Sequence, residues 1–177
     1  DIYKHHPEFI WNGDNAVQEW EDHQRLFLIV VSYSWLSKGH PDPELFHLRR
    51  LVVILRKLRA HALEYGAGEV AVAMDFCSLW QRTGELDQRE DWQKKQFNKG
   101  LHGFDLLYVH MHVTAVKMMS VPDGEQRTYE DRGWTNVESA IIASKGGVIL
   151  NRLQFDNSFD PAKESNSDED TYQFIWR

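Results

Sequence analysis

Residues 26–33 read LFLIVVSY, a short apolar run rich in β-branched side chains. A run of this kind predicts a strand that is buried on both faces, as in a parallel sheet. A polar break follows, and then residues 40–44 read HPDPE. Asp42 is a favourable N-cap and Pro43 suits a first helical turn, so we expect a long helix over about residues 43–65.

The same alternation continues along the chain. Residues 69–76 (EVAVAMDF) predict a second strand that ends near Asp75, and the aromatic spacing after residue 91 predicts a second helix. Residues 105–113, with 114–121 as a continuation, predict a third strand, residues 132–145 a third helix and residues 148–150 a fourth strand. This order predicts an α/β fold, a flavodoxin-like three-layer sandwich around a mostly parallel sheet.

The predicted elements divide the chain into three parts. Residues 1–25 form an N-terminal extension, residues 26–150 form the α/β domain, and residues 151–177 form an acidic segment with an aromatic tail. Ligands bind at the carboxyl ends of the strands in such sheets. We therefore expect the loops after Tyr33, Asp75 and Val113 to lie close together.

Composition and charge exclude several classes of function. The chain has 177 residues and a formal net charge of −7, which disfavours broad binding to a phosphate backbone, so no nucleic-acid partner is expected. Its longest purely apolar run has six residues, against roughly 20 for a membrane span. Cys77 is the only cysteine, which favours a reducing compartment and hence an intracellular, cytoplasmic location.

Two features that suggest metal or thiol chemistry have simpler explanations. His110 and His112 would face the same side of the predicted third strand, but no further ligands are evident, so we expect a structural role and no metal site. Cys77 follows the second strand without a histidine partner at a recognisable spacing. We expect it to be a buried thiol.

A motif near the third helix carries a family resemblance. Residues 129–141 read YEDRGWTNVESAI, in which Trp134 follows Tyr129 by five residues and Glu138 follows Trp134 by four. This pattern resembles the third-helix motif of Toll/interleukin-1 receptor (TIR) domains. The first strand running into Ser34 and Trp35 is similar to the opening motif of that family.

The chain more closely resembles a TIR-like group of microbial eukaryotes. Members of that group read approximately as a Ser-Trp pair, then HPDP, then D-x-x-S-L-P-Q, then Y-x-x-R-G-W-x-x-x-E. The corresponding segments here are residues 34–35, 40–43, 75–81 and 129–138, with Trp80 at the position where Pro is usual. The resemblance covers about residues 26–150 and implies a TIR-like version of the three-layer fold.

The resemblance implies chemistry on NAD, which some TIR domains cleave between nicotinamide and ribose. NAD would be a substrate, and no cofactor is expected. The leaving nicotinamide is already cationic, so the main demand is a carboxylate that stabilises an oxocarbenium-like transition state. By resemblance Glu138 has this catalytic role. The residues expected to contact the substrate are Ser32, Ser34, Trp35, Asp75, Arg132 and Trp134.

These residues also have structural interpretations, and other functions remain open. Trp134 could be a packing anchor, Asp75 a brace for its loop, and Arg132 a surface salt-bridge residue. A non-catalytic TIR-like module, acting through self-association, a partner protein or a larger assembly, is the main alternative to an enzyme. A nucleoside deoxyribosyltransferase, which uses a glutamate as nucleophile on a deoxyribose, is a third hypothesis.

Overall fold

The computed structural model describes residues 5–82, 86–145 and 152–164. Within them four strands form one sheet in the order β2-β1-β3-β4, and every neighbouring pair is parallel. The strands are β1 (Leu28–Tyr33), β2 (Ala71–Ala73), β3 (Thr114–Met118) and β4 (Arg152–Phe155). The register sets Val30 beside both Ala73 and Ala115, so β1 is hydrogen-bonded on both edges.

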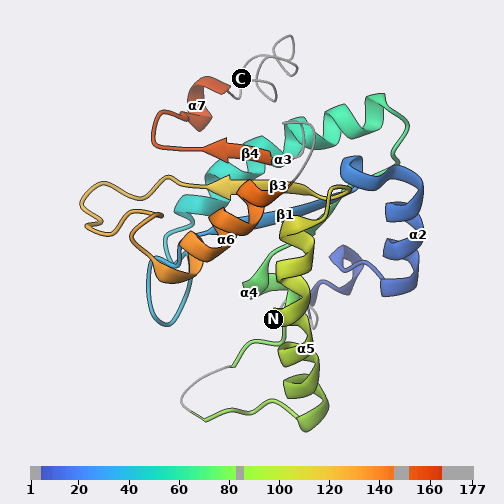
Figure 1. Ribbon diagram of the computed structural model, residues 1–177, viewed down its shortest axis with the longest axis horizontal. Helices are drawn as coiled ribbons and strands as arrows, with labels where there is room; N and C mark the ends of the chain where they lie inside the picture. The colour runs from blue at the N-terminus through green and yellow to red at the C-terminus, as the bar shows by residue number, and fades with distance from the viewer. Residues whose placement is uncertain (1–4, 83–85, 146–151, 165–177) are drawn as a thin grey trace.

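Helices cover both faces of the sheet (Figure 1). Helix α3 (Phe46–Glu64) packs on one face, and α5 (Asp91–Val109) and α6 (Gly133–Ser144) pack on the other. The shorter elements are η1 (Pro7–Phe9), α2 (Gly13–His23), η2 (Gln24–Leu26), α4 (Asp75–Ser78) and α7 (Pro161–Glu164). None of the helices in the described ranges has the length and apolar character needed to cross a bilayer.

The side chains of β1 alternate between two cores. Ile29, Val31 and Tyr33 pack in the core beneath α3, whereas Val30 packs in the core beneath α5 and α6. Successive residues of a strand point to opposite faces, so Ser32 shares the face of Val30. This alternation directs the Ser32 hydroxyl towards the α6 side of the sheet.

The strand order confirms the expected fold class, a flavodoxin-like three-layer α/β sandwich. Flavodoxin-like sheets have the order 2-1-3-4-5, and the four strands here follow its first four positions. The order reverses between β1 and β3, and ligands in such sheets bind outside the carboxyl ends of the strands at that point. The loops that follow β1 and β3 flank this switch point.

The prediction of a strand over residues 105–113 was wrong. Residues 105–109 are the last turn of α5, and β3 begins only at Thr114. The apolar stripe of α5 continues to Phe104 and Tyr108, which are four residues apart and buried, and this helical spacing outweighs the local β-branched composition. His110 is therefore the residue that ends a helix, and it does not alternate with His112 along a strand.

The start of α3 and the position of the fourth strand also differ from the boundaries predicted from the sequence. Helix α3 begins at Phe46 rather than Pro43, with Leu45 in a left-handed conformation (φ 58°) before it. Asp42 is thus not the N-cap, although its Oδ2 accepts a hydrogen bond of 2.8 Å from the Leu48 amide in the first turn. The fourth strand predicted at residues 148–150 lies outside the described residues. Strand β4 follows at 152–155, so the sheet extends past residue 150.

Candidate functional site

Three side chains meet beside β1 on the α6 side of the sheet. The Ser32 hydroxyl donates a hydrogen bond to Oε2 of Glu138, which lies on α6. Its oxygen is also 2.5 Å from the Tyr129 hydroxyl. A serine hydroxyl carries one proton, so Tyr129 must be the donor in the second hydrogen bond. The result is a buried chain of donors that runs from Tyr129 through Ser32 to the carboxylate.

Glu138 is a carboxyl group removed from water. It is 4% exposed, and burial is the main reason that its pKa rises to about 7. The negative charge of Asp75 raises the pKa further. Hydrogen-bonding groups of Ser32, Tyr108 and Trp134 favour the ionised form and oppose this shift. Glu138 therefore exchanges its proton near neutrality, as a group that takes part in catalysis often does.

A second group of contacts is centred on Asp75, the first residue of α4. Its carboxylate accepts hydrogen bonds from the Tyr33 hydroxyl at 2.9 Å and from Trp35 Nε1 at 3.1 Å. The Trp35 ring meets Phe76 edge-on, with ring centroids 5.7 Å apart. Asp75 thereby fixes the orientation of Trp35 in the loop after β1. The sequence analysis considered Asp75 as a brace for the loop that follows it, whereas its carboxylate holds the loop after β1.

Arg132 joins the two loops at the switch point. It lies directly before α6, and its Nη1 donates to the Trp35 carbonyl at 2.5 Å. Its Nη2 donates to the Arg127 carbonyl at 3.3 Å and pairs with Glu125 at 3.3 Å. The guanidinium therefore holds the loop after β1 against the loop after β3.

Ser34 and Trp134 occupy contrasting environments. Ser34 is completely buried, and its carbonyl accepts a hydrogen bond from Nε2 of His47 at 2.9 Å. Within the described part of the chain, the Ser34 hydroxyl has no hydrogen-bond partner. Trp134 is 52% exposed, one helical turn before Glu138. It is therefore not the buried packing anchor considered from the sequence.

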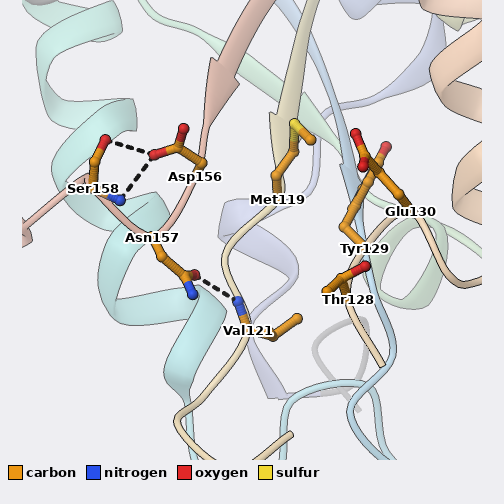
Figure 2. A pocket seen from close by; sticks show the side chains of 8 residues that line it. All are labelled: Met119, Val121, Thr128, Tyr129, Glu130, Asp156, Asn157 and Ser158. Atoms are coloured by element: carbon orange, nitrogen blue, oxygen red, sulfur yellow. Dashed lines mark hydrogen bonds between the residues drawn. The ribbon is translucent and has the colours of Figure 1, made fainter. Parts of the chain in front are cut away.

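Two open hollows lie near these residues. The β4-side hollow, about 410 Å³ in volume, is shown in Figure 2. Its lining residues are Met119, Val121, Thr128, Tyr129, Glu130, Asp156, Asn157 and Ser158. The switch-point hollow, about 500 Å³, is lined by Trp35, Leu36, Ser37, Lys38, Glu125, Arg127 and Arg132. Glu138 lines neither hollow. Tyr129 lines the β4-side hollow and lies between that hollow and Ser32.

Six of the seven predicted site residues fall into two sets, and buried Ser34 belongs to neither. Ser32 and Trp134 adjoin the buried carboxylate of Glu138, whereas Trp35, Asp75 and Arg132 form the braced edge of the switch point. Arg132 connects the sets, because it begins the helix that carries Glu138 and also contacts Trp35.

The sequence analysis did not assign a role to Tyr108, Tyr129 or His47. Tyr129 belongs to the quoted motif, so its position was a usable signal. The buried hydroxyl of Tyr108, which donates to the Val31 carbonyl at 3.2 Å, was obscured by the mistaken strand. His47 had no sequence signal, because its contact with Ser34 depends on how α3 packs.

Cys77 and the pair of histidines are the residues that suggested thiol or metal chemistry in the sequence. Cys77 is exposed, so the expectation of a buried thiol was wrong, and none of the four residues of α4 is buried. The rings of His110 and His112 lie 5.6 Å apart. In the ranges that the structure describes, no three or more His, Cys, Asp or Glu residues are placed to hold a metal ion.

Comparison with known proteins adds no further assignment. No protein-family model, no curated protein and no solved structure matches this chain. Membership of the TIR family therefore stays a prediction from the motifs.

Proposed function

We propose that this chain is a TIR-like domain that cleaves the bond between nicotinamide and ribose in NAD, with Glu138 as the catalytic carboxylate. The observation that carries the proposal is a buried carboxyl group beside the switch point, with its pKa raised to about 7 and a hydrogen bond from Ser32. Perturbed carboxyl groups of this kind concentrate at functional sites.

The chemistry needs few groups. The C–N bond breaks as its electron pair passes to the cationic nicotinamide nitrogen, which becomes neutral. The ribose carbon gains oxocarbenium character that ionised Glu138 stabilises. Water then adds to that carbon and releases one proton. Ser32 holds the carboxylate in place, and the low local polarity strengthens its attraction for the positive ribose.

Access to Glu138 requires a local rearrangement. Tyr129 lies on the wall of the β4-side hollow and covers the approach to Ser32 from that side. We infer that substrate binding displaces the Tyr129 side chain. Movement of loops and their side chains on substrate binding and product release is a common step in enzyme turnover.

The test is nicotinamide release from NAD, followed by chromatography over a range of protein concentrations. Wild-type protein should release nicotinamide, and Glu138→Gln should reduce the rate by at least about 100-fold, the scale of losing a key electrostatic group. Glu64→Gln, at the exposed end of α3, is the matched control and should keep the wild-type rate. No release by wild-type protein at any concentration, including those at which it self-associates, would falsify the enzymatic proposal.

One observation favours the alternative, a non-catalytic interaction module. Trp134 and Val137 are each 52% exposed and lie three residues apart on α6, so they form a small apolar patch on the surface of that helix. On this alternative, α6 pairs with α6 of a second copy. Light scattering should then show a mass that rises with concentration in wild-type protein and in Glu138→Gln, but not in Trp134→Ala.

A further inference from the structure

The switch-point hollow is built from the two loops that flank the reversal of strand order. Trp35, Leu36, Ser37 and Lys38 come from the loop after β1, and Glu125, Arg127 and Arg132 come from the loop after β3. At about 500 Å³ the hollow has room for part of a small ligand. Its location is the one at which flavodoxin-like sheets bind ligands.

The lining of this hollow is cationic although the chain as a whole is acidic. Lys38, Arg127 and Arg132 contribute three positive charges, against the single carboxylate of Glu125. Across the residues that the structure describes, the side chains of Lys38 and Arg127 form no hydrogen bond and no ion pair, although Arg127 lies near enough to Asp131 to lower the pKa of that carboxyl group. Two unpaired cations that border one cavity favour an anionic ligand.

The carboxylate of Glu125 already contacts two of the donors in the switch-point hollow. Its Oε1 accepts a hydrogen bond of 3.0 Å from the Arg127 amide and pairs with Arg132 Nη2 at 3.3 Å. A backbone N–H beside a guanidinium is also the donor set that binds phosphate oxygens. The Glu125 carboxylate thus takes the place that an incoming anion would take.

We propose that the switch-point hollow binds the phosphate groups of a nucleotide, and that Glu125 is an internal competitor that the phosphates displace. The identity of the nucleotide rests on the proposed function, whereas the binding of phosphate does not. Arg132 precedes Glu138 by six residues, which is roughly 9 Å along the α6 axis. A dinucleotide with its phosphates at Arg132 therefore has its sugar within range of the helix turn that carries Glu138.

Isothermal titration calorimetry with inorganic pyrophosphate tests the anion site directly. Wild-type protein should bind pyrophosphate, and the double variant Lys38→Ala, Arg127→Ala should bind at least about tenfold more weakly, because it loses two charged donors. Glu125→Gln should bind several-fold more tightly, since its side chain no longer competes as an anion. Lys95→Ala, an exposed lysine on α5, is the control for general charge and should match wild type.

The gain expected for Glu125→Gln is informative because a misfolded variant cannot produce it. Circular dichroism spectra that match wild type would establish that the double variant is folded. Equal pyrophosphate affinity in wild type, the double variant and Glu125→Gln would overturn the proposal, as would no detectable binding by wild type.

Further titrations separate a nucleotide site from a site for free phosphate. ADP-ribose should compete with pyrophosphate and bind more tightly than orthophosphate. If orthophosphate binds and ADP-ribose does not compete, the assignment to a nucleotide is wrong. Glu138→Gln should keep its affinity for pyrophosphate, so loss of cleavage and loss of phosphate binding remain distinguishable.

Discussion

Glu138 is 4% exposed, accepts a hydrogen bond from Ser32 and has a pKa raised by burial to about 7. In the unfolded chain the same carboxyl group titrates near 4.5. Between these values the folded protein holds a proton that the unfolded chain has released. The stability of the fold and the charge of the candidate site therefore depend on the same proton.

The first prediction concerns stability against pH. Because the folded state binds the extra proton, the contribution of Glu138 to stability is fully present below pH 4.5 and is lost as pH rises through 7. At pH 8 this shift costs the wild-type protein about 3 kcal/mol. Glu138→Gln has no such proton, so its free energy of unfolding in urea should exceed that of wild type at pH 8 and approach it at pH 5. A mutant that is less stable at pH 8 by a similar amount would contradict this expectation.

The second prediction concerns the hydrogen bond from Ser32. That bond favours the ionised carboxylate and lowers the pKa of Glu138. Ser32→Ala should therefore move the titration of Glu138 to higher pH, measured by carbon NMR of the labelled carboxyl group. Ser144→Ala, at the exposed end of α6, should leave the titration unchanged. A shift to lower pH in Ser32→Ala would show that the hydroxyl does not stabilise the charge.

At the scale of secondary-structure elements, α3 shows how a side chain outside a helix can accept a hydrogen bond from an amide at the start of that helix. Leu45 precedes the helix in a left-handed conformation and provides no side-chain cap. Asp42, three residues earlier, accepts the Leu48 amide instead. An amide in the first helical turn has no partner within the helix, so this hydrogen bond satisfies a group that would otherwise be unpaired.

The third prediction follows from this contact. Asp42→Ala should lower the free energy of unfolding by about 0.5–2 kcal/mol, the range measured for loss of a helix cap. Asp42→Asn keeps an acceptor oxygen and should lose less. Urea denaturation at pH 7 measures both variants. If the two variants lose equal stability, the negative charge rather than the hydrogen bond is what matters.

The elements also show which features could be predicted from sequence. The apolar run of β1 was sufficient to predict a buried central strand, because apolar residues occur on both faces of the strand. The boundary between α5 and β3 was missed, since the apolar residues 106–109 also suit a strand locally, and the buried pair Phe104 and Tyr108 that continues the helix was divided between two predicted elements. The contacts of Ser32 were also beyond prediction. They join residues 97 and 106 positions apart, whose distance depends on the complete fold.

At the scale of the whole molecule, the sheet separates two cores with different contents. The core beneath α3 is closed by aliphatic and aromatic side chains. The side beneath α5 and α6 also holds the buried polar groups of Ser32, Tyr108, Tyr129 and Glu138. Glu138 thus lies on the face of the sheet opposite α3, so a core residue of α3 away from Ser34 and Trp35 can be tested without touching that carboxyl group.

The fourth prediction uses that separation. Leu51 is 1% exposed in the core beneath α3, so Leu51→Ala should reduce the free energy of unfolding by about 2–5 kcal/mol. Leu63→Ala, on the same helix but 42% exposed, should stay within about 0.5 kcal/mol of wild type. Thermal and urea unfolding measure both. Equal effects of the two substitutions would contradict the placement of this core.

The exposed thiol of Cys77 has a practical consequence for all of these experiments. It is the only cysteine of the chain, and it lies two residues after Asp75, which holds the Trp35 indole. A maleimide fluorophore will therefore attach at one position without any mutagenesis, at a rate lowered by the raised pKa of a thiol that is desolvated and lies near Asp75. Trp35 lines the switch-point hollow, and tryptophan quenches many dyes by electron transfer at short range. A ligand that enters the hollow and shifts Trp35 would be recorded as a change in the brightness of the dye, in real time and on the unmodified sequence.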